Sequence, residues 1–345
     1  MNTDKRGWAV LLLAHGAPQH VEDIPEFLRH IHGGRPAPEA MVREIARRYE
    51  LIGGGSPLGR LTERQGRALE ARLGVPTLVG MRHWHPFIAE TVAALPTGLD
   101  RLVVICLAPH NSQKSAALDM EQVEAALGKL AEPRPCLSFI EDWHDHPLLI
   151  QAFAEKIRVG LQQSRPATRD ERAVIPLILT AHSVPESTIS GGDPYEAQAR
   201  ETAALVAAAA GLADWRMAFH SQGMTPGPWI GPTVESQIDE LAALGRRRVF
   251  IAPIGFLCDN AEILYDVDIR FREYAQARGM ELDRAESLND SPLLIEALVS
   301  LALEELRIAD CGFPDRGPWT FLRRSAHKPV RLVGNEPRPT QPNHR

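Results

Sequence analysis

The sequence has few cysteines and no closely spaced pair of them. Its 345 residues include Cys106, Cys136, Cys258 and Cys311. Without a Cys-x-x-Cys pair, the chain lacks both a redox dithiol motif and the usual zinc-ribbon spacing, and four scattered cysteines do not suggest a disulfide framework. No secretory signal is recognisable near the amino terminus, so we expect reduced thiols in a cytoplasmic protein.

The chain also lacks an excess of positive charge and long apolar runs. Lys and Arg number 38 against 44 Asp and Glu, which gives a formal net charge of −6. No basic stripe is evident, so we expect no nucleic-acid partner. The longest apolar runs have the length of a strand, which predicts no transmembrane segment. With 44% hydrophobic and 24% charged residues, the chain has a globular composition and the length of two ordinary domains.

A histidine at the end of an apolar run is the first candidate for chemistry. Residues 174–180 are typical of a buried parallel strand, and Ala-His-Ser-Val-Pro follows them with His182 in second place. Ligands of open α/β sheets bind beyond the carboxyl ends of strands, which favours a functional role for His182. The alternative is a histidine whose hydrogen bonds are satisfied in the core.

The same pattern occurs near the amino terminus. An apolar run over 10–13 leads into Ala-His-Gly-Ala-Pro, which places His15 where His182 lies in the second half. Two further runs, 103–109 and 249–253, both end on Ala-Pro. We interpret the repetition as a duplicated domain whose halves face a shared cleft, with one histidine from each. Chance similarity between buried strands is the alternative.

Apolar strands alternate with helices along the chain. The expected strands are 10–13, 77–81, 101–107 and 137–141, then 174–180, 216–220, 248–253 and 281–286. This order predicts an α/β fold of two similar three-layer doubly wound domains with four-stranded parallel sheets and an active-site cleft between them. The predicted bounds are 1–161 for the first domain, 162–172 for a linker, 173–308 for the second domain and 309–345 for a largely mobile tail.

Two carboxylates fall near the start of a helix predicted over 259–278. Glu262 and Asp266 are four residues apart and therefore share one face. A solvated acidic first turn, stabilised by the helix dipole, is the alternative. Beside a strand-end histidine, the carboxylates can attract a divalent cation and accept protons that it displaces. His15, His182 and Glu262 suit an ion of the ferrous type, which accepts both imidazole and oxygen ligands.

Two loops also attract attention. Residues 219–232 contain too many prolines and glycines for regular structure, and they include Trp229. Trp229 forms either an aromatic wall for a flat ligand or a buried anchor of the loop. The three glycines at 53–55, directly before Ser56, either allow close approach of a ligand or simply end a helix.

The motifs together resemble those of ferrochelatases over about residues 8 to 308. They are Thr-Ala-His-Ser-Val-Pro (180–185), Gly-Asp-Pro-Tyr (192–195), Pro-Gly-Pro-Trp-Ile-Gly-Pro (226–232), the run 253–268, Arg-Ala-Glu-Ser-Leu-Asn (284–289), Ile-Gly-Gly-Gly-Ser-Pro-Leu (52–58) and His-Pro-Phe (85–87). The resemblance implies a chelatase-like fold and a lyase of haem biosynthesis that inserts Fe²⁺ into a porphyrin and releases two protons. It also implies that His182 and Glu262 are catalytic and bind the metal, with Asp266 on a proton or metal path.

The segment 27–58 most resembles that of the coproporphyrin-type ferrochelatases. It carries Arg29, His30, His32, Arg35, Arg43, Arg47 and Arg48. Cations there suit a porphyrin with four carboxylates, whereas charge on a solvated helix is the alternative. Coproporphyrin III is therefore the favoured substrate, with protoporphyrin IX next. The predicted porphyrin-binding residues are His15, Arg35, Arg48, Ser56 and Trp229.

The chain departs from the family pattern at three positions. Asn260 stands where many relatives have histidine, Arg270 where they have an acidic residue, and His15 where they have tyrosine or methionine. We expect His15 to bind the metal opposite His182. A chelatase for cobalt or nickel is one alternative, and a non-catalytic carrier of haem or metal is another.

Cysteine spacing bears on a resident cluster. Some ferrochelatases hold a [2Fe–2S] cluster through cysteines near the carboxyl terminus, where this chain has only Cys311. We therefore expect no cluster and no permanently bound cofactor. The expected partners are the substrates, a porphyrin and ferrous iron.

Overall fold

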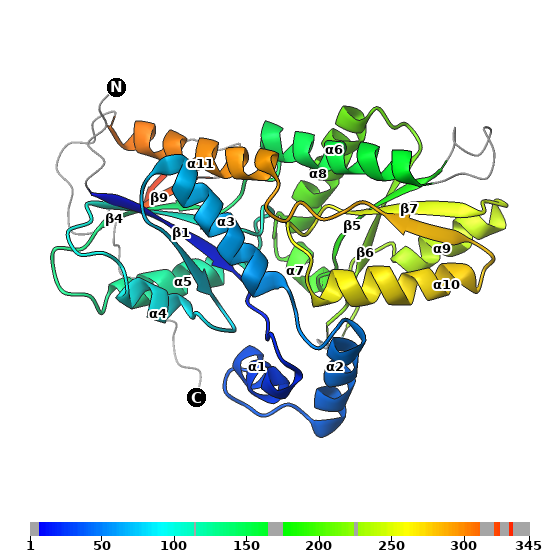
Figure 1. Cartoon of the computed structure of the whole chain (residues 1–345), viewed down its shortest axis with the longest axis horizontal. Coiled ribbons are helices and arrows are strands. Elements are labelled where there is room, and N and C mark those ends of the chain that lie inside the picture. Colours follow the sequence, from blue (N-terminus) through cyan, green and yellow to red (C-terminus); the bar gives the residue numbers. More distant parts are fainter. Residues whose placement is uncertain are drawn as a thin grey trace.

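Two sheets form the framework of the computed structural model, which describes residues 7–113, 115–164, 175–223, 227–310, 321–324 and 331–333. The first sheet has the order β10-β9-β4-β3-β1-β2 and the second the order β6-β5-β7-β8 (Figure 1). The strands are β1 (Trp8–Ala14), β2 (Thr77–Met81), β3 (Arg101–Cys106), β4 (Cys136–Ile140), β5 (Leu177–His182), β6 (Trp215–His220), β7 (Arg248–Pro253), β8 (Glu281–Arg284), β9 (Phe321–Arg324) and β10 (Arg331–Val333).

Helices surround both sheets. Within the described residues they are η1 (Val21–Asp23), α1 (Ile24–Ile31), α2 (Glu39–Leu51), α3 (Leu58–Leu73), α4 (Ile88–Ala93), α5 (Ala116–Leu127), α6 (Pro147–Gln163), α7 (Glu186–Ser190), α8 (Tyr195–Ala210), α9 (Val234–Ala243), η3 (Ile263–Phe271), α10 (Arg272–Gln276) and α11 (Pro292–Asp310). None of these described helices is long and apolar enough to cross a bilayer.

The predicted four parallel strands of each half are confirmed. β1 to β4 pair in parallel in the first sheet, and β5 to β8 do so in the second. β1 shows why the fold is layered: Val10 and Leu12 belong to one buried cluster, Leu11 and Leu13 to another. Successive side chains of a strand point to opposite faces, so β1 is covered on both. Figure 1 shows α3 and α11 on one side of this sheet and α4 and α5 on the other.

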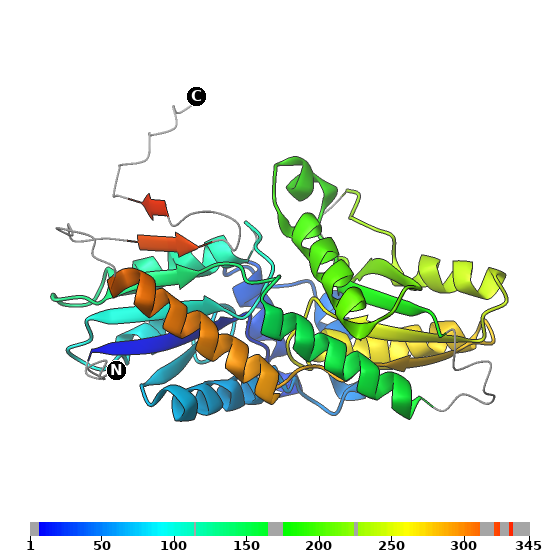
Figure 2. The same cartoon turned by 90° about the horizontal axis from the view of Figure 1, so that it is seen from above.

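Part of the predicted tail belongs to the first sheet. β9 pairs in parallel with β4, and β10 pairs antiparallel with β9, so the first sheet has six strands (Figure 2). Residues 321–324 and 331–333 of the predicted tail are thus strands of the first sheet, while the prediction of a largely mobile tail stays a prediction. An unpaired sheet edge leaves backbone N–H and C=O groups without partners, and the added strands supply them along β4. The other tail residues from 311 onward, and residues 165–172 of the predicted linker, lie outside the described residues.

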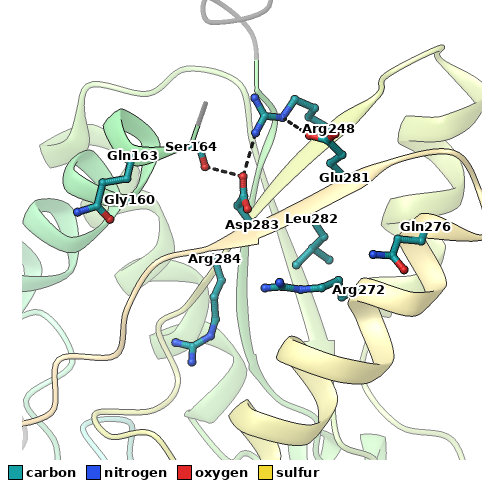
Figure 3. Close-up of a pocket in the computed structure, with 10 residues that line it drawn as sticks. All are labelled: Gly160, Gln163, Ser164, Arg248, Arg272, Gln276, Glu281, Leu282, Asp283 and Arg284. Atoms are coloured by element: carbon teal, nitrogen blue, oxygen red, sulfur yellow. Dashed lines mark hydrogen bonds and ion pairs between the residues drawn. The ribbon is translucent and has the colours of Figure 1, made fainter. Parts of the chain in front are cut away.

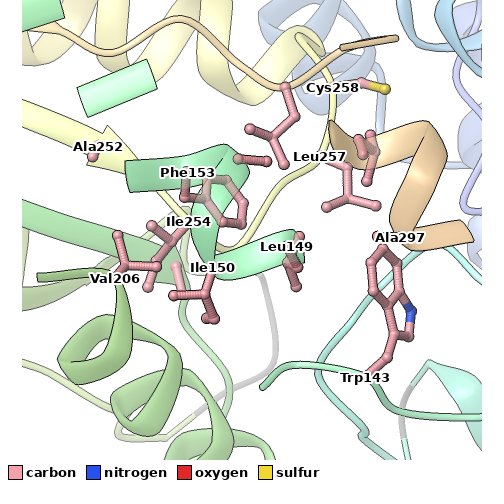
Figure 4. Packing of buried hydrophobic residues seen from close by; sticks show 14 of the residues in the cluster. Trp143, Leu149, Ile150, Phe153, Val206, Ala252, Ile254, Leu257, Cys258 and Ala297 are labelled. Carbon is pink, nitrogen blue, oxygen red and sulfur yellow. The ribbon is translucent and has the colours of Figure 1, made fainter. Parts of the chain in front are cut away.

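One hydrophobic cluster runs through both halves. It contains Val10 of β1 and Phe250 of β7, and Figure 4 shows its part around Trp143, Leu149 and Phe153. Trp143 is fully buried, and its indole N–H donates to the carbonyl of Cys106 at 2.9 Å. The two sheets thus share a continuous core.

Two helices each pack against the sheet that is formed by the other half of the chain. Gly160 of α6 lies so close to Phe250 of β7 that a Cβ there would be 2.6 Å from the ring. α11 lies on the first sheet, where Arg101 of β3 donates to the carbonyl of Leu306 at 3.4 Å. The domain bounds 1–161 and 173–308 stay a prediction, and this packing argues against cutting the chain there.

The helix predicted over 259–278 is not a single α-helix. Its centre is the π-helix η3, which is followed by the short α10. Ile263, Val267 and Phe271 repeat every four residues and are all fully buried. The i→i+5 bonding of a π-helix gives a wider turn than that of an α-helix, so a strict four-residue repeat stays on one face. The same geometry keeps Glu262 and Asp266 on a common face, as predicted.

Candidate active site

The end of β5 carries the first group of the site. His182 is its last residue, and His182 Nδ1 is hydrogen bonded to the carbonyl oxygen of Ser183. A carbonyl only accepts, so Nδ1 bears the proton and Nε2 is left for other partners. Nε2 lies 3.4 Å from Oε1 of Glu262, the residue directly before η3. The structure thus brings together a histidine and a carboxylate that are 80 positions apart in the sequence.

Neighbouring backbone and side chains hold this strand end. The N–H of Gly255 donates to the carbonyl of Thr180 at 3.1 Å. A Cβ at Gly255 would lie 2.7 Å from the Cα of Ala181, so this position requires glycine. On the other side, the half-buried Tyr195 of α8 donates its hydroxyl to the carbonyl of His182 at 2.9 Å. His182 is therefore fixed by both flanking elements.

The His182–Glu262 pair has opposed pKa shifts. Burial disfavours the charged His182 ring, but the charge and hydrogen bond of Glu262 outweigh burial and raise the pKa of His182 above 6.5. Burial likewise disfavours ionised Glu262, yet the attraction of His182 holds the pKa of Glu262 below 4.5. Both side chains keep contact with solvent, at 35% and 42% exposure. The pair can therefore hold and exchange a proton with a bound substrate.

Asp266 lies behind this pair and is buried. It accepts a hydrogen bond from the hydroxyl of Ser221, and the Ser221 hydroxyl in turn accepts one from His220 Nδ1 at 2.7 Å. Arg270 Nη1 is 3.6 Å from the other carboxylate oxygen. Burial opposes ionisation of Asp266, but His220, Arg270 and Ser221 together hold its pKa below 3.8. Arg270, a departure from the family pattern, is thus a counter-ion of Asp266.

His15 lies near the pair from the first half of the chain. It directly follows β1, and the charges of Glu262 and His182 both act on its ring. Its Nδ1 is 3.0 Å from the carbonyl of Gly16, the same arrangement that His182 has with the next carbonyl. The His15 residue is exposed to solvent, but desolvation by the atoms around its ring and then the charge of Arg82 lower the pKa of His15 below 6.5. Each of the two strand-end histidines thus uses Nδ1 for a backbone contact, which leaves Nε2 for other partners. That both bind one metal ion stays a prediction.

The predicted porphyrin-binding arginines differ in their placement. Arg48 on α2 pairs with Glu44 at 2.9 Å, and its guanidinium lies 5.1 Å from the ring centre of Tyr265 on η3. Its neighbour Arg47 donates to the Tyr265 hydroxyl at 2.8 Å, so α2 meets the helix that follows Glu262. Arg35 is exposed and bonds only locally, to the carbonyl of His32 at 3.4 Å. Arg48 is thus near the site, whereas no contact joins Arg35 to the other predicted residues.

The two loop residues also differ. Ser56 is buried, and its hydroxyl oxygen accepts from the N–H of Leu58 at 3.3 Å at the start of α3. Trp229 is half-buried and forms a β-bridge with Pro185, just beyond His182. Trp229 is therefore beside the end of β5 that carries His182, while the hydroxyl of Ser56 is turned to the backbone.

Some residues of the site were missed from the sequence. His83 follows β2, and its ring centre is 4.6 Å from that of His15. Burial, then His15 and Arg82, lower its pKa to about 3. A signal for His83 existed, since it follows a predicted strand as His15 does. His220 and Tyr265 gave no such signal, because their roles depend on contacts with distant segments.

A cavity elsewhere in the fold does not belong to this site. It has a volume of about 530 Å³ and lies beside β8 (Figure 3). Its lining includes all of β8, from Glu281 to Arg284, so it lies along the edge strand of the second sheet. Arg248 there is paired with Asp283 at 3.0 Å. None of the predicted site residues lines it.

The fold is that of the chelatases. The sirohydrochlorin chelatase SirB of Bacillus subtilis subspecies spizizenii, solved in complex with cobalt, has a TM-score of 0.56 to this chain at 11% identity, covering 89% of this chain and 98% of its own. At that identity the likeness shows the fold alone.

Sequence comparisons identify the family. The ferrochelatase family model matches residues 7–306. A ferrochelatase of Acidobacterium capsulatum is 45% identical over 325 residues, covering 89% of this chain and 98% of the relative. A coproporphyrin III ferrochelatase of Geobacillus kaustophilus is 37% identical over 309 residues, covering 87% and 96%. The chain belongs to the ferrochelatase family, which confirms the resemblance found in its motifs.

Proposed function

We propose that this protein is a lyase that inserts Fe²⁺ into a porphyrin with release of two protons, as a step of haem biosynthesis. Its family supports this reaction class. The observation that carries the proposal is the distance of 3.4 Å between His182 Nε2 and Glu262 Oε1. The charges of both side chains also act on the ring of His15. The cytoplasmic location and the absence of a [2Fe–2S] cluster stay predictions, and Cys311 lies outside the described residues.

In this proposal His182 and Glu262 are the catalytic residues. Inserting a dication displaces two pyrrole protons, which must be accepted close to the macrocycle. Glu262, whose pKa is lowered, is ionised at neutral pH and attracts the cation. Neutral His182 can accept a pyrrole proton at Nε2, and the charge of Glu262, which raises the pKa of His182, stabilises the imidazolium that forms. Glu262 is the second base at this place and can accept the other proton.

Asp266 is proposed to lie on the path by which protons leave. Its carboxylate accepts a hydrogen bond from the Ser221 hydroxyl, which is hydrogen bonded in turn to the ring of His220. Arg270 beside it offsets its negative charge, which favours a role in proton transfer over a role in holding a dication.

The proposed porphyrin contacts are His15, Arg48, Arg35, Ser56 and Trp229, with coproporphyrin III as the preferred substrate. Arg48 gives this preference most support, because its guanidinium is 5.1 Å from the ring centre of Tyr265 on η3. A substrate carboxylate can replace Glu44 as the partner of Arg48. Several relatives bear the name coproporphyrin III ferrochelatase, which is consistent with this preference.

An insertion assay tests the proposal. The protein is mixed with coproporphyrin III or protoporphyrin IX and with Fe²⁺, Zn²⁺, Co²⁺ or Ni²⁺, and the product spectrum is followed. We expect turnover with Fe²⁺, faster with coproporphyrin III. His182→Ala should abolish insertion while porphyrin still binds and Tm stays near that of the wild type. His85→Ala is the matched control, since His85 is exposed and paired with Glu90. Stoichiometric binding without turnover would identify a carrier instead.

A further inference from the structure

The histidines that follow β1 and β2 lie side by side. The two strands are parallel neighbours, with Ala14 opposite Met81. Backbone pairing continues past the strand ends, where the N–H of Arg82 donates to Ala14 and that of His83 donates to the carbonyl of His15 at 2.9 Å. Two loops that leave the same edge of the sheet are thereby tied together. This pairing brings the imidazoles of His15 and His83 to one place.

The ring spacing matches two ligands of one ion. The ring centres are 4.6 Å apart, and the planes are inclined by 50°. An imidazole nitrogen binds a transition ion at about 2.0–2.1 Å, which sets each ring centre about 3.2 Å from the ion. Centres separated by 4.6 Å then subtend an angle of about 90° at the ion, which is the angle of two adjacent ligands.

Hydrogen bonding leaves nitrogen lone pairs available. The contact of His15 Nδ1 with the carbonyl of Gly16 places the proton on Nδ1 and the lone pair on Nε2. For His83, no hydrogen bond to the ring is found among the described residues. Arg82 is the nearby cation, and its guanidinium is 3.3 Å from the buried carboxylate of Asp119, which offsets its charge. Glu262, whose charge acts on His15, adds a negative charge from the other half.

We propose that His15 and His83 form a two-imidazole site that takes up a borderline divalent cation, such as Fe²⁺, Co²⁺ or Zn²⁺, before it enters the porphyrin. The described residues include no group of three or more His, Cys, Asp or Glu side chains placed to hold a metal ion. Structural zinc sites use four protein ligands and retain the ion. Two protein ligands leave the other positions to water, which suits an ion that must be passed on. This inference rests on the proposed function for its role, but not for the binding itself.

Metal binding without porphyrin tests the site. Co²⁺ is added to the full-length protein, and its visible absorption and calorimetric affinity are measured. His15→Gln and His83→Gln should each weaken binding at least about tenfold, the smallest loss seen when support of a metal ligand is removed. His85→Gln, two positions along the same loop, is the matched control and should bind as the wild type does. Binding that is unaffected by His83→Gln, or lost only in Glu262→Gln, would overturn the proposal.

A second measurement, made on the wild-type protein, tests the site even if the variants fail to fold. In the wild-type protein, paramagnetic Co²⁺ should shift and broaden the ring resonances of His15 and His83 at substoichiometric metal, before those of His182. The reverse order would place the ion on the catalytic pair and refute the site. In the insertion assay, His83→Gln should raise the KM for the metal more than it lowers kcat. If the wild type binds Co²⁺ at this pair yet never turns over, the proposed function fails and the site stands.

Discussion

Replacing Glu262 by glutamine should lower the pKa of His182. The carboxylate stabilises the protonated ring across the 3.4 Å between Oε1 and Nε2, and glutamine keeps the shape while removing the charge. In the variant, burial of His182 is no longer opposed by this attraction. The imidazolium becomes less stable relative to the neutral ring, so its pKa falls.

The size of the shift follows from distance and screening. Two unit charges at that distance interact by about 1.2 kcal/mol in water and about 5 kcal/mol at an effective dielectric constant of 20. The side chains are 35% and 42% exposed, which places the pair toward the screened limit. Since one pKa unit corresponds to about 1.4 kcal/mol, we expect the pKa of His182 to fall by about one unit.

Histidine ring resonances, followed by NMR over a pH series, measure the shift directly. Glu90→Gln is the matched control, because Glu90 is 3.1 Å from His85 in a more exposed pair. It should leave the pKa of His182 unchanged, because the Glu90 charge acts on an exposed pair away from His182. A pKa of His182 that stays the same or rises in Glu262→Gln would refute the reasoning.

The same pair makes a pH-dependent contribution to stability. The raised pKa of His182 contributes fully below 6.5, its ordinary value, and the contribution is lost as pH rises through the folded-state pKa. The lowered pKa of Glu262 contributes above 4.5 and is lost as pH falls through its folded-state value. Between these values Glu262→Gln should lower the free energy of unfolding by about 1 kcal/mol, measured by urea unfolding. No difference from the wild type in this window would contradict the pairing.

Three further predictions concern activity. Glu262→Gln should lower kcat at least about a hundredfold, as expected for a lost proton-transfer group, whereas a change confined to KM would limit Glu262 to substrate binding. Arg48→Ala should raise the KM for coproporphyrin III more than that for protoporphyrin IX, and equal effects in steady-state assays would remove Arg48 from carboxylate recognition. His15→Ala should keep insertion at saturating metal within about tenfold, or 1.4 kcal/mol, yet change the visible spectrum of bound metalloporphyrin. An unchanged spectrum would argue against ligation by His15.

Part of the site could be predicted because functional groups of parallel sheets lie at the carboxyl ends of their strands. His15 and His182 each follow an apolar run, so each was expected at the carboxyl end of a strand in its own sheet. That the two strand ends face a shared cleft was inferred from the repeated sequence pattern, not from strand order within one sheet. Glu262 was also predictable, since its four-residue spacing from Asp266 survives the change from α-helix to π-helix. These inferences needed only periodicity and a repeated motif, which can be read from the sequence.

The rest depended on contacts that no local pattern encodes. α6 packs on the second sheet and α11 on the first because their apolar faces fit there, as the close contact of Gly160 with Phe250 illustrates. The Arg47–Tyr265 hydrogen bond joins residues 218 positions apart, so neither side chain reveals its partner. β9 and β10 are short and bordered by prolines and charged residues in the sequence, and their pairing is decided by the open edge of β4.

The charges around η3 suggest separate routes for protons and metal. Arg270 stands one turn beyond Asp266 on the same face and also pairs with Glu235 at 3.0 Å. The positive charge of Arg270 beside Asp266 repels an approaching dication but does not prevent transfer of protons through hydrogen bonds. The two-imidazole site of His15 and His83 offers neutral nitrogen ligands instead, and the charge of the neighbouring Arg82 is offset by Asp119. These charges favour entry of the metal past His15 and His83 and exit of the protons through Asp266. The two departures from the family pattern, Arg270 and His15, would then both serve to separate the route of the metal from that of the protons.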